Sequence, residues 1–530
     1  MRVARISCVS TPNNAWRLNE VRCLFSAVIL SMVTELASAA DIVITADTPP
    51  AINNDQRCSL VEAIINANDD DRTHSDCVAG NGPDVIVLPT SSTQVLTSAD
   101  NSVYGPTGLP VITSTITIEG NGSTLVRESG APLFRILAVA KSGELRLQKT
   151  NIRGGASQRY GDVSQNGGVG YGDPSQGGAV LNYGMLEVAD SEIADNSAVS
   201  GGGGIHSEGG TLLVRDSLFS GNAANGAGGA VSQIRNYGTL VNFVCSGNTA
   251  WLYGGCMWVG GTSTVTMTTS TIRDNYSHAS GGGLRAEWNS VLLVTDSTIS
   301  GNGALGAGGG ISVGAHAVAL VQNTSIADNM SEVEGGGIVA EGTLALVKNS
   351  TVSGNLAPRG GGVVTGTGGT TRGTTTLMSS TVALNQASLE GGGVINSSPG
   401  PLFLSHTLIA GNTAMSQPSE VQDDTGSAIA NAFNLFGYDG NAASVGFTAK
   451  KNDIVPTSSL GEILDAELRN NGGPTDTHAL IAGSPAIDAG DPKFSNMTAG
   501  SEWMYDQRGP GFLRFDPESR TVDIGAFEYQ

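Results

Sequence analysis

One short phrase recurs along the middle of the chain and limits what the chain can fold into. An asparagine, preceded three residues earlier by a mainly apolar residue, returns every 26 or 27 residues, with one interval of 30. A second apolar position follows each asparagine by eight or nine residues, and a group of glycines lies directly before it. Short segments of this kind cannot bury an apolar face alone, so the repeat predicts a solenoid of stacked turns. The asparagines are Asn196, Asn222, Asn248, Asn275, Asn302, Asn329, Asn355, Asn385 and Asn412.

The length of the repeat indicates the kind of solenoid. A period near 26 residues fits one turn of a three-faced parallel β-helix, whereas hexapeptide helices need about 18 residues and leucine-rich repeats carry their own leucine pattern. We therefore expect an all-β, right-handed parallel β-helix of about a dozen turns. An N-terminal cap with a short helix at residues 58–68 and a small β-rich C-terminal domain should close its two ends.

The composition supports this fold and excludes others. The 530 residues include 74 glycines, and a glycine costs about 1 kcal/mol inside a helix, which excludes a helix bundle. The glycines have no three-residue period and prolines number only 19, which excludes collagen. A hydrophobic share of 39% excludes wholesale disorder. A net charge of −21 makes nucleic acid a poor partner.

The recurring asparagine is interpreted as structural. Stacked amides at one corner of the helix can bond to the turns above and below, and all nine repeats carry the residue, unlike a catalytic group. A second polar position repeats in the same register and is expected to form turns. Its members include Asp190, Asp216, Asp296, Asn323 and Asn349.

The first forty residues resemble an export signal. Arg2, Arg5, Arg17 and Arg22 precede an apolar run at residues 23–33, and a small-residue site follows. We expect a signal peptide over residues 1–40, cleaved near Ala39 or Ala40, and a secreted or cell-surface protein. No segment of the mature chain is expected to span a membrane.

Four cysteines remain after such cleavage, and they allow three pairings. Proximity in the sequence favours Cys58–Cys77 and, more weakly, Cys245–Cys256, and an exported protein can keep both disulfides. Buried free thiols are the alternative for the second pair. The domains are predicted as a cap with the first turn over residues 41–110, the β-helix repeats over 111–430 and the C-terminal domain over 431–530.

Three motifs carry resemblances to known families. Residues 58–63, Cys-Ser-Leu-Val-Glu-Ala, resemble the C-S-L-R-E-A segment of exported bacterial β-helix proteins, with Val61 in place of arginine. Residues 471–475 and 483–490, with Asp-Ile-Gly-Ala-Phe-Glu-Tyr at 523–529, are similar to the choice-of-anchor Q domain. Phrases such as Phe-Ser-Gly-Asn at 219–222 are similar to repeats of polymorphic outer-membrane proteins. These resemblances imply an exported bacterial surface or secreted β-helix and, for the repeats, an adhesin-like role.

A candidate ligand site follows from the alternation of side chains along a strand. If the apolar residue after the glycines points inward, the next one points outward, which places His206, Trp258 and Arg285 on a solvated face. Trp251, Tyr253, Tyr276, His278 and Trp288 are nearby in the sequence. Aromatic rings beside charged groups suit a saccharide, so a carbohydrate site is predicted. Chance aromatics on a solvated face are the alternative. The predicted ligand-binding residues are Trp258, Arg285, Glu287, Trp288 and His206.

The function expected from these residues is binding of a polysaccharide or a cell-surface ligand by a monomer. The alternative is a polysaccharide lyase or glycoside hydrolase of the pectin-lyase-like fold, with Arg285 facing a uronate and His206 or His278 as base. A hydrolase could pair Glu208 with Glu287, but these are three turns, or about 14 Å, apart, too far for either stereochemical course. Catalytic residues therefore stay unassigned, and a purely structural spacer is a third interpretation.

No cofactor is expected, with one weak alternative. Asp488, Asp491, Asp506 and Asp523 lie in glycine-rich turns, where carboxylates could bind Ca²⁺. The favoured interpretation is that these side chains bond to the local backbone.

Overall fold

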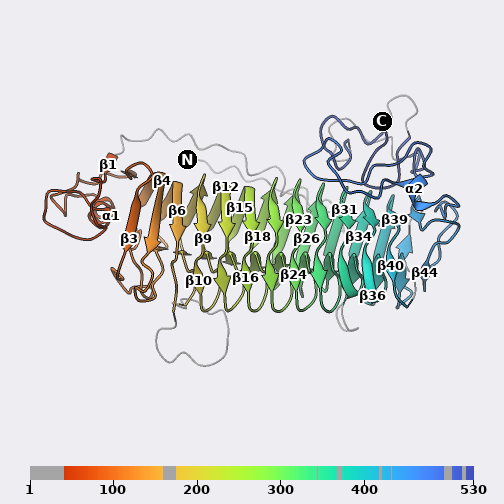
Figure 1. Ribbon diagram of the computed structural model, residues 1–530, viewed down its shortest axis with the longest axis horizontal. Helices are drawn as coiled ribbons and strands as arrows, with labels where there is room; N and C mark the ends of the chain where they lie inside the picture. The colour runs from red at the N-terminus through yellow and green to blue at the C-terminus, as the bar shows by residue number, and fades with distance from the viewer. Residues whose placement is uncertain are drawn as a thin grey trace, which may run out of the picture. The chain divides into compact units, whose positions relative to one another are not determined.

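The computed structural model describes residues 41–158, 175–342, 344–366, 373–416, 420–430, 433–493, 504–515 and 521–530. The expected signal peptide at residues 1–40 lies outside the described residues. All described residues belong to one compact unit, Ala39–Gln530. Within it the chain forms a right-handed parallel β-helix, which confirms the predicted fold class, and the strands of successive turns lie side by side in rows (Figure 1).

Sheet I is the 12-stranded sheet that contains the second apolar position of each repeat. Its strands pair in parallel and in chain order, each with the equivalent strand of the next turn. They are β5 (Leu137–Val139), β7 (Val180–Asn182), β11 (Ile205–Glu208), β14 (Val231–Ile234), β17 (Met257–Gly260), β21 (Leu284–Ala286), β25 (Ile311–Val313), β29 (Ile338–Ala340), β33 (Val363–Thr365), β37 (Val394–Asn396), β41 (Val421–Asp423) and β44 (Ser444–Val445).

Sheet II has 23 strands because most turns contribute two strands to it, separated by a bend. They are β1 (Asp41–Val43), β2 (Asp84–Val87), β3 (Thr93–Leu96), β4 (Thr115–Arg127), β6 (Glu144–Arg153), β8 (Met185–Ala189), β9 (Glu192–Ala194), β12 (Thr211–Ser220), β15 (Tyr237–Ser246), β18 (Thr264–Thr268), β19 (Thr271–Arg273), β22 (Val291–Thr295), β23 (Thr298–Ser300), β26 (Val318–Gln322), β27 (Ser325–Ala327), β30 (Leu344–Lys348), β31 (Thr351–Ser353), β34 (Thr375–Met378), β35 (Thr381–Ala383), β38 (Leu402–Ser405), β39 (Leu408–Ala410), β42 (Ile429–Ala430) and β43 (Leu435–Phe436).

The bend in sheet II is the second polar position of the repeat. Asp296 and Asn323 have φ of +50° and Asn349 has +47°, the left-handed conformation that Asn and Asp tolerate. Asp190 and Asp216 bend the earlier turns in the same way, with φ of +49° and +51°. The expectation that these residues form turns is confirmed.

Sheet III has nine short strands and completes each turn. They are β10 (Ser197–Ala198), β13 (Ala223–Ala224), β16 (Thr249–Ala250), β20 (Tyr276–Ser277), β24 (Gly303–Ala304), β28 (Met330–Ser331), β32 (Leu356–Arg359), β36 (Gln386–Glu390) and β40 (Thr413–Ala414).

The nine repeat asparagines form a continuous buried ladder between sheets II and III. Each of the first eight donates both its backbone N–H and its Nδ2–H to the Oδ1 of the next asparagine, at 2.8–3.1 Å. Asn412 has no asparagine after it and donates both groups to Glu420 Oε2 instead, at 3.1 and 2.5 Å. Every buried rung thus keeps its hydrogen bonds.

The N-terminal cap contains the expected helix, α1 (Leu60–Asp69), which packs on β2 and β4 of the first turns. The Ser59 hydroxyl accepts from the Glu62 N–H, and the Glu62 carboxylate accepts from the Ser59 N–H, so the helix begins at a capping box. The Cys58–Cys77 disulfide ties the start of α1 to the following loop, and Cys245–Cys256 links sheet II to sheet I within one repeat. Both predicted disulfides are confirmed.

The C-terminal segment differs from the expected β-rich domain. After β44, the described residues contain one regular element, α2 (Leu460–Ile463), and isolated bridges such as Leu464–Leu480. The segment lies against β31 and β39 (Figure 1) and bonds to the outer face of sheet II, through Thr351–Gln507 and Ser353–His478. Side-chain bonds to this face replace strand pairing, so the segment covers the sheet without extending it.

Candidate ligand-binding site

The residue after the second apolar position of the repeat points outward from sheet I, as predicted. The prediction that these outward side chains are exposed is wrong. Met257 belongs to the main core, whereas the next residue, Trp258, packs in a separate cluster with Ala227 and Ile234. Trp258 therefore lies on the outer side of the sheet. It is nevertheless fully buried, as is His206, and Arg285 is only 7% exposed.

The loop between sheets III and I causes this burial, since it folds over the outer face of the next strand. In one turn the covering residue is Tyr253, which packs against Trp258 and lies 5.1 Å from the Arg285 guanidinium. In later turns the loop residue that lies over the outward side chain is a glycine. A Cβ at Gly335, for example, would lie 2.1 Å from the Val339 side chain. Alternation along a strand predicts which side a residue faces, but not what covers that side.

The buried side chains Trp258, Arg285 and Glu287 form one polar network. The indole Nε1–H of Trp258 donates to Glu287 Oε1 at 2.8 Å, and Arg285 donates to Glu287 Oε2 at 3.2 and 3.3 Å. Arg285 also donates to Ser312 Oγ at 2.6 Å and lies 3.6 Å from Glu341 Oε2. Charge-assisted bonds of this kind fix the orientation of both buried groups.

Trp288 is the exposed member of the predicted site. Its side chain is 49% exposed, and its ring stands edge-on to Trp258, with centroids 5.3 Å apart and an angle of 85°. Its backbone is held at φ of +58°, and its carbonyl accepts from the Thr262 N–H at 3.0 Å. A left-handed conformation at a bulky residue costs about 1–3 kcal/mol and persists only where its surroundings enforce it. The contact with Trp258 and this constrained backbone therefore hold the exposed ring of Trp288 in place.

His206 belongs to a second network, apart from Trp288. His206 Nε2 lies 3.8 Å from Glu208 Oε2, and the half-exposed Arg235 donates to Glu208 Oε1 at 2.8 Å. Burial raises the pKa of Glu208, but bonds and charges from His206 and Arg235 together hold it below the usual value. Of the five predicted residues, Trp258, Arg285, Glu287 and Trp288 come together and His206 does not.

The other nearby aromatics lie beside sheet III. The exposed Trp251 stacks on His278 with centroids 4.4 Å apart, and Tyr276 meets the same imidazole edge-on at 5.1 Å. Two residues of the network lie outside the predicted set: Tyr253, and Glu341, which continues the register of Glu287. The register of the repeat could have identified Glu341 as a member of the site. Nothing in the sequence predicts that Tyr253 lies over Arg285.

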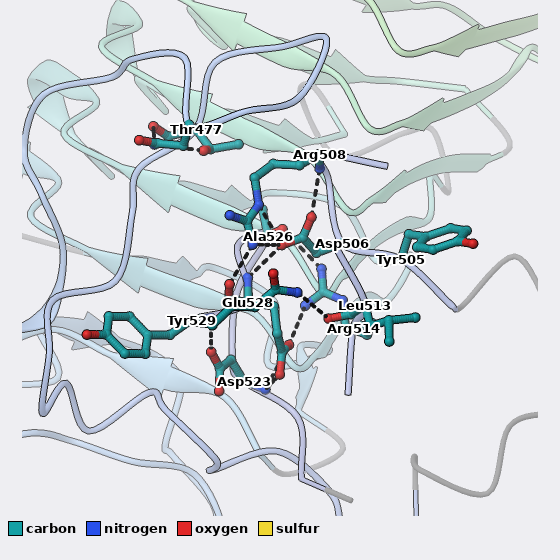
Figure 2. Close-up of polar contacts among 12 residues, drawn as sticks. Thr477, Tyr505, Asp506, Arg508, Leu513, Arg514, Asp523, Ala526, Glu528 and Tyr529 are labelled. Atoms are coloured by element: carbon teal, nitrogen blue, oxygen red, sulfur yellow. Dashed lines mark hydrogen bonds and ion pairs between the residues drawn. The ribbon is translucent and has the colours of Figure 1, made fainter. Parts of the chain in front are cut away.

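A third charged cluster lies in the C-terminal segment (Figure 2). Asp506 pairs with Arg508 at 2.7 Å, and the Arg508 guanidinium lies about 4 Å from the rings of Phe512 and Phe527. Glu528 donates its backbone N–H to Asp506 Oδ2 at 2.8 Å. The carboxylate and guanidinium groups of this cluster are bonded to one another and to the backbone, as suits a structural role.

The C-terminal aspartates do not converge on a metal site. Asp506 is engaged by Arg508, Asp523 accepts the backbone N–H of Asp488, and Asp491 accepts that of Lys493. In the described part of the chain, no three His, Cys, Asp or Glu side chains gather closely enough to hold a metal ion. Burial raises the pKa of Asp523 to about 6, and burial and Asp523 raise that of Glu528 well above its usual value.

Comparison with known proteins adds no family to this description, since no protein-family model and no curated protein gives a significant match to the chain. Among the helices in the described ranges, none is long and apolar enough to cross a membrane.

Proposed function

We propose that this protein binds a neutral polysaccharide on the outer face of sheet I, around Trp288, and does not cleave it. The observation that carries the proposal is the exposed Trp288 ring, held edge-on against a buried tryptophan that is itself bonded to Glu287. A rigid aromatic face packs against the C–H face of a sugar ring at little entropic cost. The Glu341 side chain, which is 22% exposed, supplies an acceptor for a hydroxyl group.

The charges around Trp288 favour a neutral chain over an acidic one. Glu287 and Glu341 both lie beside the guanidinium of Arg285, at 3.2 and 3.6 Å. The whole protein carries a net charge of −21. A polyuronate would therefore approach two carboxylates on a protein of strongly negative net charge, and this charge disfavours its binding.

Binding without cleavage is favoured because the groups proposed for catalysis are already engaged. Arg285 is held by Glu287 and Ser312, and the buried His206 faces Glu208 rather than solvent. Glu208 and Glu287 lie in separate networks. A lyase or hydrolase needs a base or a pair of carboxyl groups open to the substrate.

The proposal places the protein outside the cell, as an adhesin-like surface or secreted protein. Two disulfides support an oxidising compartment. The signal-like N-terminus and the resemblance to exported bacterial β-helix proteins support the same location. A monomer remains the expected form.

The test compares Trp288→Ala with Trp251→Ala, which removes a tryptophan beside sheet III that is 59% exposed, against 49% for Trp288. The mature protein and both variants are incubated with insoluble neutral, amino and acidic polysaccharides, and the bound fraction is measured. We expect retention on a neutral polysaccharide that Trp288→Ala reduces about tenfold and Trp251→Ala leaves unchanged. Release of reducing or unsaturated oligosaccharides would establish the lyase or hydrolase alternative, and absence of retention on every polysaccharide would overturn the proposal.

A further inference from the structure

A shallow, open groove of about 500 Å³ lies where sheet I turns into sheet II, several turns before Trp288. Its aromatic wall consists of Tyr183 and Tyr237, and Lys141 and Glu144 stand at one end. Tyr237 is 71% exposed, and Tyr183 is supported by Tyr104, with ring centroids 5.2 Å apart. The groove therefore combines aromatic ring faces with charged groups on an open surface, which suits an extended ligand lying along the turns.

Glycine backbone forms part of the floor of this groove. A Cβ at Gly184 would lie 2.2 Å from the Gly143 carbonyl oxygen, and one at Gly210 would lie 1.9 Å from that of Gly184. The close stacking of the turns thus requires glycine at these positions.

The register of sheet I connects the groove with Trp288. Ser207 pairs with Asn182, so Tyr183 lies beside Glu208. Glu208 pairs with Ile234 and Ile234 with Gly260. Val259 pairs with Ala286, so Glu287 follows beside Gly260 and Trp288 lies just beyond. Four turns, roughly 19 Å, therefore separate Tyr183 from Trp288 along one edge of the sheet.

The register positions between these two ends, Glu208, Ile234 and Gly260, are buried, but Arg235 beside them is polar and accessible. Arg235 is 47% exposed in its side chain and is oriented by Glu208 at 2.8 Å. Tyr237 follows two residues later, in the same turn. From the groove to Trp288, this edge thus presents Tyr183, then Arg235 with Tyr237, and finally Trp288.

We propose that the groove is a second contact region for the polysaccharide, so that one neutral chain runs along the turns from Tyr183 past Tyr237 to Trp288. This inference rests on the function proposed above and adds the direction and length of the bound chain. Ligands that reach both aromatic ends should bind more tightly, because the second contact is then intramolecular.

The test measures dissociation constants for a series of soluble oligosaccharides prepared from the neutral polysaccharide that the protein retains. Trp288→Ala should weaken binding of every length. Tyr237→Ala should weaken long oligosaccharides about fivefold to tenfold, and leave unchanged those shorter than two turns, roughly 10 Å. Phe403→Ala removes a ring that is 37% exposed on the outer face of sheet II and serves as the control.

The results distinguish a failure of the groove proposal from a failure of the proposed function. If Tyr237→Ala binds long chains as tightly as the wild type while Trp288→Ala is weakened, the groove is overturned and the proposed function stands. If neither variant changes binding, both are overturned. Lys141→Ala, an exposed change at the groove, repeats the length comparison should Tyr237→Ala lower the melting temperature.

Discussion

Two glycines determine how the side chains lie on the outer face of sheet I. A Cβ at Gly260 would lie 2.5 Å from the indole ring of Trp258, and one at Gly314 would lie 2.6 Å from Arg285 Nη2. Other turns carry Glu208 or Glu287 at this position of the repeat. The missing side chains leave room for the indole and the guanidinium to lie flat along the sheet and reach Glu287.

Gly314→Ala should therefore disturb the support of Trp288 without touching a ligand. The added methyl group displaces the Arg285 guanidinium from Glu287, which weakens a buried charge-assisted bond and lowers the free energy of unfolding by about 1–3 kcal/mol. We expect weaker retention on polysaccharide and an earlier thermal transition. Gly461→Ala, where nothing lies within 4 Å of the added methyl group, is the control and should lower neither quantity, since alanine is favoured over glycine in the helix α2.

At the scale of the element, the asparagine ladder holds the turns in register. Each rung is buried, and each accepting Oδ1 receives two donors from the turn before it. Removing one side chain thus affects two turns at once, because the preceding rung loses its acceptor and the following rung its donor.

Asn302→Ala should be strongly destabilising. It leaves the buried backbone N–H of Asn275 without its acceptor, at about 1–3 kcal/mol, and removes one of the three acceptors of Asn275 Nδ2. Asn225→Ala, at an exposed position of the neighbouring loop, should be nearly neutral. Denaturant unfolding of the two variants measures the difference, and equal stabilities would contradict the structural role of the ladder.

The ladder and the strands were predictable from the sequence because each depends on one residue type at one position of every repeat. The burial of Trp258 and His206 was not predictable, since it depends on loops whose residues differ from turn to turn, such as Tyr253 above Trp258. The way the C-terminal segment packs was not predictable either, because its bonds to Thr351 and Ser353 join residues more than a hundred positions apart.

At the scale of the whole molecule, several carboxyl groups are buried with raised pKa values. Burial raises the pKa of Glu420 to about 7, against the donors Asn412 and Gly411, which favour the carboxylate. Asp523 and Glu528 are raised as well. Burial, with the charge of Arg514, has the opposite effect on His406 and lowers its pKa to about 4. Folding therefore changes the proton affinity of groups at several places along the chain.

Glu420 should make the protein less stable as the pH rises from 5 to 8. Because its pKa is about 7 when folded and near 4.5 when unfolded, the folded state holds more protons between these values. Its contribution is thus present at low pH and lost as the pH rises through 7, a change of about 2 kcal/mol. His406 acts oppositely between about pH 4 and 6.5.

The comparison of the wild type with Glu420→Gln isolates this contribution from those of the other groups. The difference between their free energies of unfolding should change by about 2 kcal/mol between pH 5 and pH 8. A difference that stays constant across this range would show that Glu420 does not titrate there.

The ladder that ends on Glu420 is a directional chain of dipoles. All the donors point toward the later turns, so their positive ends meet at Asn412, where a carboxylate lies within 2.5 Å. This arrangement corresponds to an acidic residue at the start of an α-helix. The ladder acceptor of each asparagine belongs to a later part of the chain. During synthesis, the donors of the most recent turn therefore have no ladder acceptor until the following residues have been added. Glu420 is the residue at which that dependence ends.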